Sequence, residues 1–408
     1  MIRWIADNLG TAAWDLVDEE AGMSLVDARD LVDRSGNRPE AVRAKLDEAL
    51  SMLQVGRRVV ICCDYGISRS NALAAGVLAL SGSMPLQRAV RQVVSRVGET
   101  AIKLDMLAVV RAAIGEPALA VASPNRGRRI LVTGCGGFVG SGLVAKLRHR
   151  HEVISPSRAS VDYTCDAIAL DLIARESAID TIVHLAHPRV LTTNESLGIA
   201  LMMLKNVIDV CVSNAARLLF LSSWEVFSGY RTPGLLADES LAPHPGGTYG
   251  LTKTLCEALM EHSRESVGLR YVLLRSSPVY GPAGDKPRFI RNFAGKAARN
   301  SPIVTHRYQN GFPMLDLMHV DDLHRAIVLA VESDVADTLH LGTGRLTSTA
   351  DIARTIVALL DSASSITHAG IDAPVANIAM DGSRAKATLG WLPRVDLDVG
   401  LSQVVTGA

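Results

Sequence analysis

The sequence predicts an α/β protein of two domains, the larger of which contains a doubly wound parallel sheet. A short apolar run at residues 130–132 is followed by glycines at positions 134, 137 and 140, which predicts a strand, a tight turn and a helix. Beyond this turn, apolar runs alternate with helical patterns, which is typical of a parallel sheet. The 408 residues exceed one ordinary core, so we expect a second, smaller α/β domain.

Composition excludes several classes of protein. Hydrophobic residues make up 48% of the chain and charged residues 21%, which is typical of a globular protein. Lys plus Arg and Asp plus Glu both number 42, so no charge excess favours nucleic acid as a partner. The sequence predicts neither a membrane span nor a secretory signal, and no metal site. Six cysteines, two of them adjacent, do not make a disulfide framework, so we expect a cytoplasmic protein.

In the first domain, a C-x5-R loop lies between an expected strand at residues 57–63 and an expected helix at residues 70–80. Such a loop directs backbone N–H groups inward and binds anions. Its positive field lowers the pKa of a thiol, so Cys63 would be a thiolate nucleophile. Arg69 can hold two phosphate oxygens with its planar guanidinium, and Ser70 can donate to the departing thiolate. The alternative is that Cys63 is a buried structural thiol in an ordinary turn.

The residues CDYGISRS (63–70) resemble the loop of the dual-specificity, cysteine-dependent protein phosphatases. The resemblance implies a general acid upstream, for which Asp33 is the first choice and Asp30 the second. An expected helix at residues 40–53 fits the layout of that family, and helical patterns at 86–97 and 102–114 complete a small α/β unit. One departure is Cys62, which stands where the family usually has histidine.

The glycine-rich turn TGCGGFVG (133–140) predicts a dinucleotide site in the second domain. The first glycine permits the turn, the second lets the backbone approach a pyrophosphate, and the third lets the following helix pack on the strand. The start of that helix, expected at residues 141–149, presents N–H groups to the phosphates. The cofactor-binding residues assigned here are Gly134, Gly137, Phe138, Val139 and Gly140.

The cofactor is expected to be NADP or NAD, with NADP favoured. The second strand, at residues 151–155, is followed by Arg158, where NAD-preferring sites usually carry an acidic residue. Arginine there can pair with a 2′-phosphate; the alternative is that Arg158 is simply exposed. Asp162 is expected near the adenine. A strand at residues 181–186 brings Leu185 and Ala186 past the cofactor.

Tyr249 and Lys253 are four residues apart and therefore share one face of a helix. An ammonium near a phenol favours the phenolate, so Lys253 should lower the pKa of Tyr249, and it can also bond the nicotinamide ribose. Ser223, at the carboxyl end of an expected strand at residues 218–223, can hold the substrate hydroxyl that Tyr249 deprotonates. Hydride would then move between the sugar carbon and the nicotinamide. The alternative is an ordinary surface pair, since Y-x-x-x-K is common in helices.

The second domain resembles the extended short-chain dehydrogenase/reductase family of nucleotide-sugar epimerases and dehydratases. The resemblance implies a Rossmann-type sheet with a smaller substrate-binding lobe, catalysis by Ser223, Tyr249, Lys253 and Glu225, and a homodimer. The motifs that carry it are TGCGGFVG (133–140), HLA (184–186), SSWEVFSG (222–229), YGLTK (249–253), LRSSPVYGP (274–282), LDLMHVDDL (315–323), HLGTG (340–344) and SRAKATLGWLP (383–393).

Departures from the family pattern limit the substrate. Trp224 replaces the aspartate of the dehydratases and only Glu225 remains, which argues against 4,6-dehydration. Pro278 and Leu315 stand where asparagine and arginine often bind the substrate diphosphate. The substrate therefore either lacks the usual nucleoside diphosphate or is held by other groups. Candidate substitutes are Arg275, Arg288 and Arg291.

The predicted organisation is a phosphatase-like domain at residues 1–116, a linker at 117–127 and an NAD(P)-binding domain at 128–408. We expect a bifunctional enzyme of carbohydrate or polysaccharide biosynthesis, with a sugar or nucleotide-sugar substrate in the second domain and a phosphorylated substrate in the first. The alternative is a regulatory protein whose second domain senses NADP and controls the phosphatase without turning over sugar.

Overall fold

The computed structural model describes residues 2–17, 23–98, 102–116, 127–157, 160–282 and 288–406. The chain divides into two compact units. The first comprises Met1–Val121 with Val161–Ala178 and Ser213–Ala215, and the second comprises the rest. Arg158 and residues 117–126 of the predicted linker lie outside the described residues.

The first unit is built on a four-stranded sheet in the order β1-β2-β4-β3. Strand β4 pairs in parallel with both β2 and β3, and β1 is antiparallel to β2. The central position of β4 explains why its last five residues are buried. The strands are β1 (Arg3–Ala6), β2 (Leu9–Ala13), β3 (Met23–Asp27) and β4 (Arg58–Cys63), with a 3-10 turn η1 (Trp14–Leu16) after β2.

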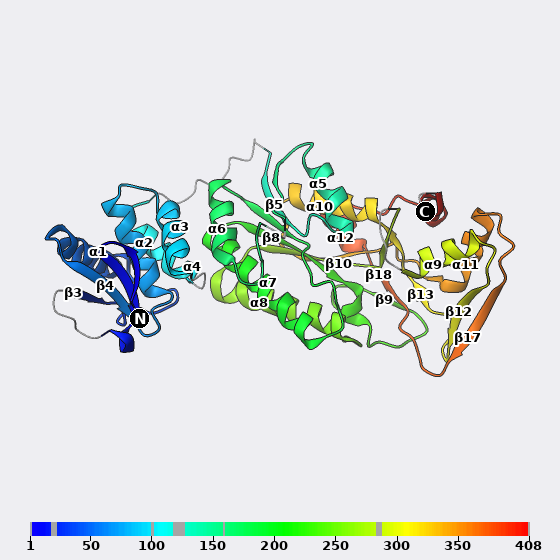
Figure 1. The fold of residues 1–408 in the computed structure, drawn as a ribbon. Coiled ribbons are helices and arrows are strands. Elements are labelled where there is room, and N and C mark those ends of the chain that lie inside the picture. The colour runs from blue at the N-terminus through cyan, green and yellow to red at the C-terminus, as the bar shows by residue number, and fades with distance from the viewer. Residues whose placement is uncertain are drawn as a thin grey trace. The chain divides into compact units, whose positions relative to one another are not determined.

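Four helices complete this part of the first unit, as the periodicity predicts (Figure 1). They are α1 (Pro39–Gln54), α2 (Arg69–Ser81), α3 (Leu86–Val97) and α4 (Leu104–Ala113). Helix α1 begins with a proline, whose fixed φ suits the first helical position, and buries Val42, Leu46 and Ala49 on one face. Helix α2 contacts the other three helices and β4, which is why its side chains are buried on all sides. This packing fixes the N-terminus of α2 near the carboxyl end of β4.

The second unit contains a six-stranded sheet in the order β15-β10-β8-β7-β5-β6, and every neighbouring pair is parallel. The strands are β5 (Arg129–Thr133), β6 (Glu152–Ile154), β7 (Thr181–His184), β8 (Arg217–Ser223), β10 (Tyr271–Ser276) and β15 (Thr338–Leu341). The chain runs from β5 to β6 at one edge and resumes at β7 on the other side of β5. This reversal makes a topological switch point between β5 and β7, where open α/β sheets bind ligands.

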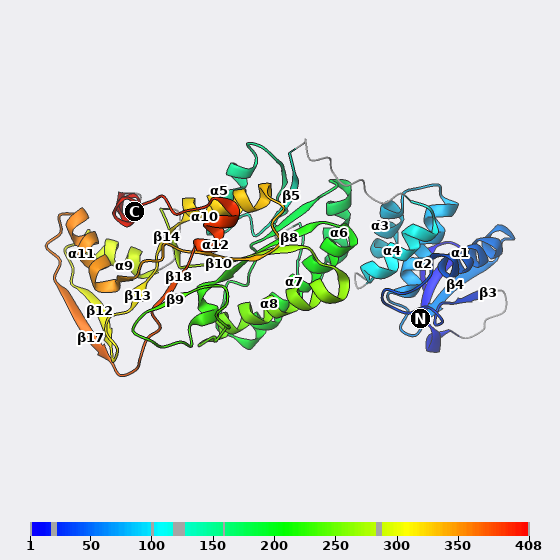
Figure 2. The ribbon, with the colours of Figure 1, turned by 180° about the vertical axis from the view of Figure 1, so that it is seen from behind.

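Helices cover both faces of this sheet, with α5 and α10 on one face and α7 and α8 on the other (Figures 1 and 2). Apolar side chains from α5, α10 and the strands form one continuous core. The helices are α5 (Phe138–Leu147), α7 (Asn194–Ser213), α8 (Thr248–Val267), α10 (Val320–Glu332) and α12 (Ser383–Leu389), with a 3-10 turn η2 (Trp224–Phe227) after β8. Helix α6 (Ala167–Glu176), grouped with the first unit, lies between β6 and β7 in the chain. The predicted doubly wound sheet is confirmed, and α5 begins three residues earlier than expected.

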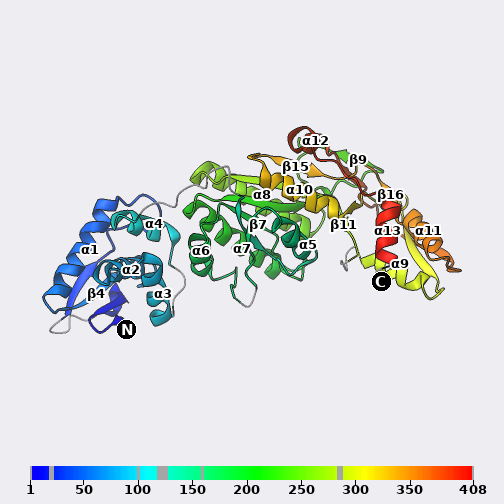
Figure 3. The same cartoon turned by 90° about the horizontal axis from the view of Figure 1, so that it is seen from above.

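A smaller lobe forms the C-terminal side of the second unit, where α9, α11 and α13 gather beside β12 and β17 (Figure 3). Its helices are α9 (Arg288–Ala297), α11 (Thr349–Leu359) and α13 (Leu397–Thr406). Its short parallel or antiparallel pairs are β9 (Leu235–Ala237) with β18 (Ile378–Met380), β11 (Val279–Tyr280) with β14 (Met318–His319), β12 (Ile303–Tyr308) with β17 (Ile366–Ile371), and β13 (Met314–Leu315) with β16 (Thr347–Ser348).

Within the described residues, α7 is long and apolar enough to cross a membrane by length and composition. Core helices of globular proteins meet the same criterion, and 44% of its apolar window is buried in the structure. Leu204, Val207 and Cys211 are fully buried. These contacts account for the apolar sequence of α7 as a helix packed on the sheet.

Candidate active sites

The glycine-rich turn lies at the switch point of the six-stranded sheet, directly after β5. Gly134 has a φ of +71°, and a Cβ there would stand 2.6 Å from the Ala186 nitrogen. A Cβ at Gly140 would stand 2.2 Å from the Gly134 carbonyl oxygen. Packing therefore requires glycine at both positions. Gly137 has a negative φ and a single contact, at 3.3 Å, so packing alone constrains it less than it constrains Gly134 and Gly140.

Two neighbouring segments are fixed beside this turn. The Thr133 hydroxyl accepts hydrogen bonds from the backbone nitrogens of Leu185 and Ala186, both at 3.2 Å. The N-terminus of α5, with Phe138 and Val139 in its first turn, starts directly after Gly137. Backbone N–H groups at a helix start, beside a turn that leaves no room for side chains, suit a pyrophosphate. The residues present therefore fit a dinucleotide.

The choice between NAD and NADP stays a prediction. Arg158, the residue on which it rests, lies outside the described residues. Asp162 is exposed, and its carboxylate accepts hydrogen bonds from the Thr164 nitrogen at 2.9 Å and hydroxyl at 2.6 Å.

Ser223, Tyr249 and Lys253 come together at the carboxyl end of β8. Ser223 Oγ accepts a hydrogen bond from the Glu225 nitrogen at 3.2 Å, and Ser223 lies close enough to Tyr249 to act on the pKa of the phenol. Lys253 lies one helical turn after Tyr249 and is buried. Its Nζ donates to the Leu221 carbonyl oxygen at 2.8 Å. The arrangement brings a phenol, a hydroxyl and an ammonium from two elements to one place.

The pKa of Tyr249 is raised, contrary to the prediction. Burial raises it most, the charge of Glu225 adds to that effect, and the hydrogen bond with Ser223 opposes both. Burial also lowers the pKa of Lys253. Because the ammonium is bonded to the Leu221 carbonyl and lies 5.8 Å from the Tyr249 ring centroid, the prediction that Lys253 lowers the pKa of the phenol is wrong for this arrangement.

Arg275 was a candidate for binding the substrate diphosphate, and this prediction is wrong. The side chain is buried and forms an ion pair with Glu257 at 2.7 Å. Glu257 also accepts a hydrogen bond from the Ser222 hydroxyl, and Arg275 lies 3.3 Å from His340 Nε2. This network joins α8 to β8, β10 and β15 behind the catalytic residues. The signal that could have found it is the position of Glu257, one turn after Lys253 on α8.

Among the described residues, the structure does not identify another arginine that could bind the substrate diphosphate. Arg291 donates to the Pro282 carbonyl oxygen, and the side chain of Arg288 is not described. Leu315 packs against the apolar core of the smaller lobe. Sequence reasoning also missed His187, whose ring meets that of Tyr249 edge-on with 5.3 Å between centroids. Its signal is its place directly after the HLA motif.

Cys63 ends β4 in the first unit, and the loop up to Arg69 surrounds its sulfur. The Ser70 hydroxyl lies 3.4 Å from Cys63 Sγ. Burial acts to raise the pKa of Cys63, but hydrogen bonds from Ser70 and from the backbone of Ile67 and Gly66 outweigh it, so the pKa is lowered. By contrast, burial raises the pKa of the neighbouring Cys62 to about 11. Of the two adjacent thiols, only Cys63 is therefore placed to act as a thiolate.

Arg69 connects this loop to the segment that carries the expected general acid. One guanidinium nitrogen donates to the Leu31 carbonyl oxygen at 2.9 Å, and the other is paired with Asp64. Asp33 Oδ1 is buried and has no hydrogen-bond partner among the described residues, and Asp33 Oδ2 lies 3.4 Å from Lys103 Nζ. Asp30 is exposed and paired with Lys45 at 3.1 Å. These environments favour Asp33 over Asp30 as a group kept for a substrate.

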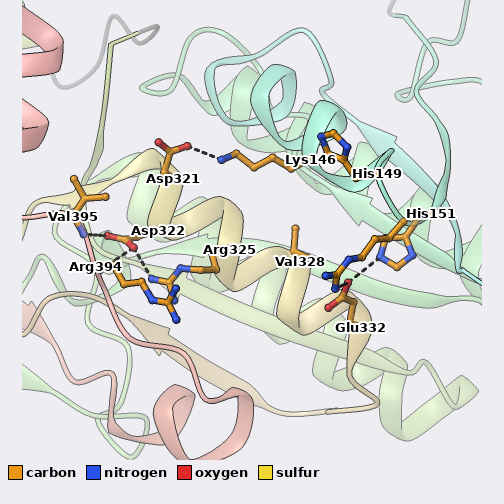
Figure 4. Close-up of a pocket in the computed structure, with 11 residues that line it drawn as sticks. Lys146, His149, His151, Asp321, Asp322, Arg325, Val328, Glu332, Arg394 and Val395 are labelled. Carbon is orange, nitrogen blue, oxygen red and sulfur yellow. Dashed lines mark hydrogen bonds and ion pairs between the residues drawn. The ribbon is translucent and has the colours of Figure 1, made fainter.

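A cavity of about 550 Å³ lies elsewhere, along one side of α10 (Figure 4). Its acidic side chains are paired with basic ones: Asp321 with Lys146 at 2.8 Å, Asp322 with Arg325 at 2.6 Å, and Glu332 with Arg150 at 3.2 Å. None of the predicted site residues lines it. The cavity therefore does not belong to either candidate site.

Known proteins resemble the second unit. GDP-mannose 3,5-epimerase from Arabidopsis thaliana is 24% identical over 68% of this chain and 81% of the relative. A UDP-glucose 4-epimerase assigned in Methanocaldococcus jannaschii is 26% identical over 68% of this chain and 97% of the relative. The structure of UDP-glucose 4-epimerase from Thermus thermophilus in complex with NAD has a TM-score of 0.61 and 23% identity, and covers 69% of this chain and 98% of that one.

The structure of RMD from Pseudomonas aeruginosa in complex with NADPH also has a TM-score of 0.61, with 20% identity over 69% of this chain. The model of the NAD dependent epimerase/dehydratase family matches residues 130–342. This match begins after the Cys63 loop, so the phosphatase resemblance of the first unit stays a prediction. Over its second unit, the resemblance predicted from the motifs is confirmed: the chain belongs to the NAD dependent epimerase/dehydratase family.

Proposed function

We propose that the second unit is an NAD(P)-dependent epimerase or reductase that acts on a nucleotide sugar. Family membership supports this, and the named relatives act on sugars linked to GDP or UDP. The observation that carries the proposal is that Ser223, Tyr249 and Lys253 gather at the carboxyl end of β8, in the sheet that bears the Gly134 turn. When bound, the cofactor would exchange hydride with the sugar carbon, its oxidised form as acceptor and its reduced form as donor.

The chain's own residues orient the sugar and move its proton. Tyr249 exchanges a proton with the reacting hydroxyl, and Ser223 holds that hydroxyl through a shared hydrogen bond. The charge of Glu225 acts to raise the pKa of Tyr249, and we assign the Glu225 carboxylate as the group that accepts a second proton from the sugar. Trp224 offers no acid to expel a hydroxyl group, so epimerisation or reduction is favoured over dehydration.

The test is turnover of a panel of UDP- and GDP-linked hexoses with NAD or NADP, analysed by chromatography of the products. We expect one of them to be converted, and Tyr249→Phe to lose about a thousandfold in kcat because proton transfer is lost. Cofactor binding with no conversion of any sugar would instead favour the NADP-sensing alternative. Turnover that survives in Tyr249→Phe would remove the assigned base.

We propose in addition that the first unit hydrolyses phosphate monoesters. The lowered pKa of Cys63 within an anion-binding loop supports this proposal. The thiolate would attack phosphorus while Asp33 gives its proton to the departing ester oxygen, which leaves a phosphocysteine and a free alcohol. Water would then cleave the phosphorus–sulfur bond, release inorganic phosphate and restore the thiolate. Ser70 would stabilise the thiolate in both steps.

Hydrolysis of para-nitrophenyl phosphate by the full chain tests this second activity. We expect Cys63→Ser to abolish it and Asp33→Asn to slow it by about a hundredfold or more, while sugar turnover by the second unit is unchanged. Hydrolysis that survives in Cys63→Ser would exclude Cys63 as the nucleophile.

A further inference from the structure

We propose that Asp64 determines the specificity of the Cys63 site, restricting it to substrates with a single phosphate and hydroxyl groups nearby. This inference rests on the proposed phosphatase function. Asp64 follows the nucleophile directly, and its carboxylate is ion-paired with Arg69. No role in hydrolysis itself requires an acidic residue at this position.

The ion pair with Asp64 engages the guanidinium of Arg69, which is the group expected to bind the substrate phosphate. The Arg69 side chain is only 10% exposed, and its NH1 nitrogen already donates to the backbone carbonyls of Leu31 and Arg29, at 2.9 and 3.4 Å. Its NH2 nitrogen is held by Asp64. Because a guanidinium binds phosphate through two parallel N–H groups, a phosphate at the Nε–NH2 edge of Arg69 competes with the Asp64 carboxylate for the NH2 nitrogen.

Asp64 can move away without disturbing the fold. Its side chain is 52% exposed, whereas Arg69 is fixed by the backbone on its other side. Once displaced, the carboxylate remains attached to the residue beside Cys63 and therefore stays close to the bound phosphate. The phosphate then binds beside the thiolate of Cys63 and the carboxylate of Asp64, with the guanidinium of Arg69 as its direct partner and the charges of Arg29 and Lys103 farther out, on Asp64 and Asp33.

The charge of the Asp64 carboxylate would discriminate between phosphate esters with different neighbouring groups. A second phosphate on the substrate would face Asp64 as a like charge, and like charges within 4–6 Å disfavour each other by about one or more pK units, or about tenfold. A sugar hydroxyl near the phosphate would instead donate a hydrogen bond to the same carboxylate. The chemical class that fits is therefore a singly phosphorylated sugar or other polyol.

The first experiment measures tungstate binding to the full chain by calorimetry. Asp64→Asn removes the charge but keeps the shape, and we expect it to bind tungstate about tenfold more tightly than the parent chain. The matched control is Asp47→Asn, which removes an equally exposed carboxylate (52%) from its ion pair with Arg43 on α1. Its tungstate affinity should not change. The midpoint of thermal unfolding shows that both variants are folded.

The second experiment compares kcat/KM for glucose 6-phosphate and glucose 1,6-bisphosphate by phosphate release. We expect the parent chain to prefer the monophosphate, and Asp64→Asn to reduce that preference about tenfold. A parent chain that hydrolyses phosphate esters, with the same tungstate affinity and the same preference in Asp64→Asn, would overturn the inference alone. If the parent chain neither binds tungstate nor releases phosphate, the phosphatase function fails and the inference fails with it.

Discussion

Both candidate sites place a serine hydroxyl near the group that loses a proton, the Cys63 thiol in one and the Tyr249 phenol in the other. The pKa of the thiol is lowered, whereas the pKa of the phenol is raised. Ser70 and the backbone N–H groups of one loop lower the pKa of Cys63 despite its burial. Ser223 also acts to lower the pKa of Tyr249, but burial and Glu225 prevail and raise it. The two sites differ in the number of donors, since the Cys63 loop supplies several and the Tyr249 site supplies one, and in the charge of Glu225, which acts on Tyr249.

This comparison separates a local site from an assembled one. Residues 63–70 contain the nucleophile and its donors in one loop between β4 and α2. The Tyr249 site takes its parts from β5, β7, β8 and α8, which are far apart in the sequence. A local site depends mainly on its loop, whereas an assembled site depends on the packing that holds its elements in register.

The largest expected effect concerns the packing behind the assembled site. Arg275→Met leaves Glu257 buried and without its ion-pair partner, which should lower the stability of the second unit by about 3–5 kcal/mol. Differential scanning calorimetry measures this as a lower transition temperature. The matched control is Lys205→Met, which breaks the exposed pair with Asp209 on α7 and should cost about 0–1 kcal/mol. Equal losses in the two variants would contradict the structural role assigned to Arg275.

A smaller effect is expected in the glycine-rich turn. Gly134→Ala places a side chain on a residue with positive φ and against the Ala186 nitrogen. This strain should weaken dinucleotide binding by about 1–3 kcal/mol. Titration with NAD and NADP, monitored by tryptophan fluorescence, measures the affinity. Gly136→Ala is the control, since a Cβ there meets no atom within 4 Å. A Gly134→Ala variant that binds dinucleotide as tightly as Gly136→Ala would contradict the tight turn described here.

The next effect is a shift in the reactivity of Cys63 with pH. Ser70→Ala removes a donor that lowers the pKa of the thiol, so the pKa should rise. Since only the thiolate reacts, alkylation by iodoacetamide should then require a higher pH. The measurement uses a Cys165→Ser background, because Cys165 is the exposed cysteine among those described. Ser51→Ala in α1 is the control, and an unchanged profile in Ser70→Ala would refute the activation of Cys63 by Ser70.

The smallest effect is expected at the corresponding serine of the second unit. Ser223→Ala removes the hydrogen bond that opposes burial, so the pKa of Tyr249 should rise further. The phenolate form then requires a higher pH, and the rising limb of the profile of kcat against pH should move upward by about one unit or less. A shift to lower pH would show that Ser223 does not lower the pKa of Tyr249.

The sequence alone predicts much of both sites because their motifs are contiguous and have strong local requirements. Gly134 and Gly140 are required by backbone geometry, and Cys63 and Arg69 fall between a strand and a helix. Pairings between distant elements could not be predicted in the same way. Arg275 reads equally well as a surface or a buried residue until β10 is placed beside β8, where it meets Glu257.

The sign of the Tyr249 pKa shift could not be predicted for a related reason. The spacing from Tyr249 to Lys253 places both on one face of α8, but it does not show which acceptor the ammonium reaches. In the structure this acceptor is the Leu221 carbonyl oxygen of β8. Burial, which determines the direction of the shift, follows from tertiary packing and not from the helix period.

The most direct test of the central claim is a crystal structure of the full chain grown with NADP and, separately, with NAD. The claim predicts a dinucleotide whose pyrophosphate lies over the N–H groups of Phe138 and Val139, with its nicotinamide ring within reach of the Tyr249 hydroxyl. A cofactor bound elsewhere, or a nicotinamide ring far from Tyr249, would contradict the account.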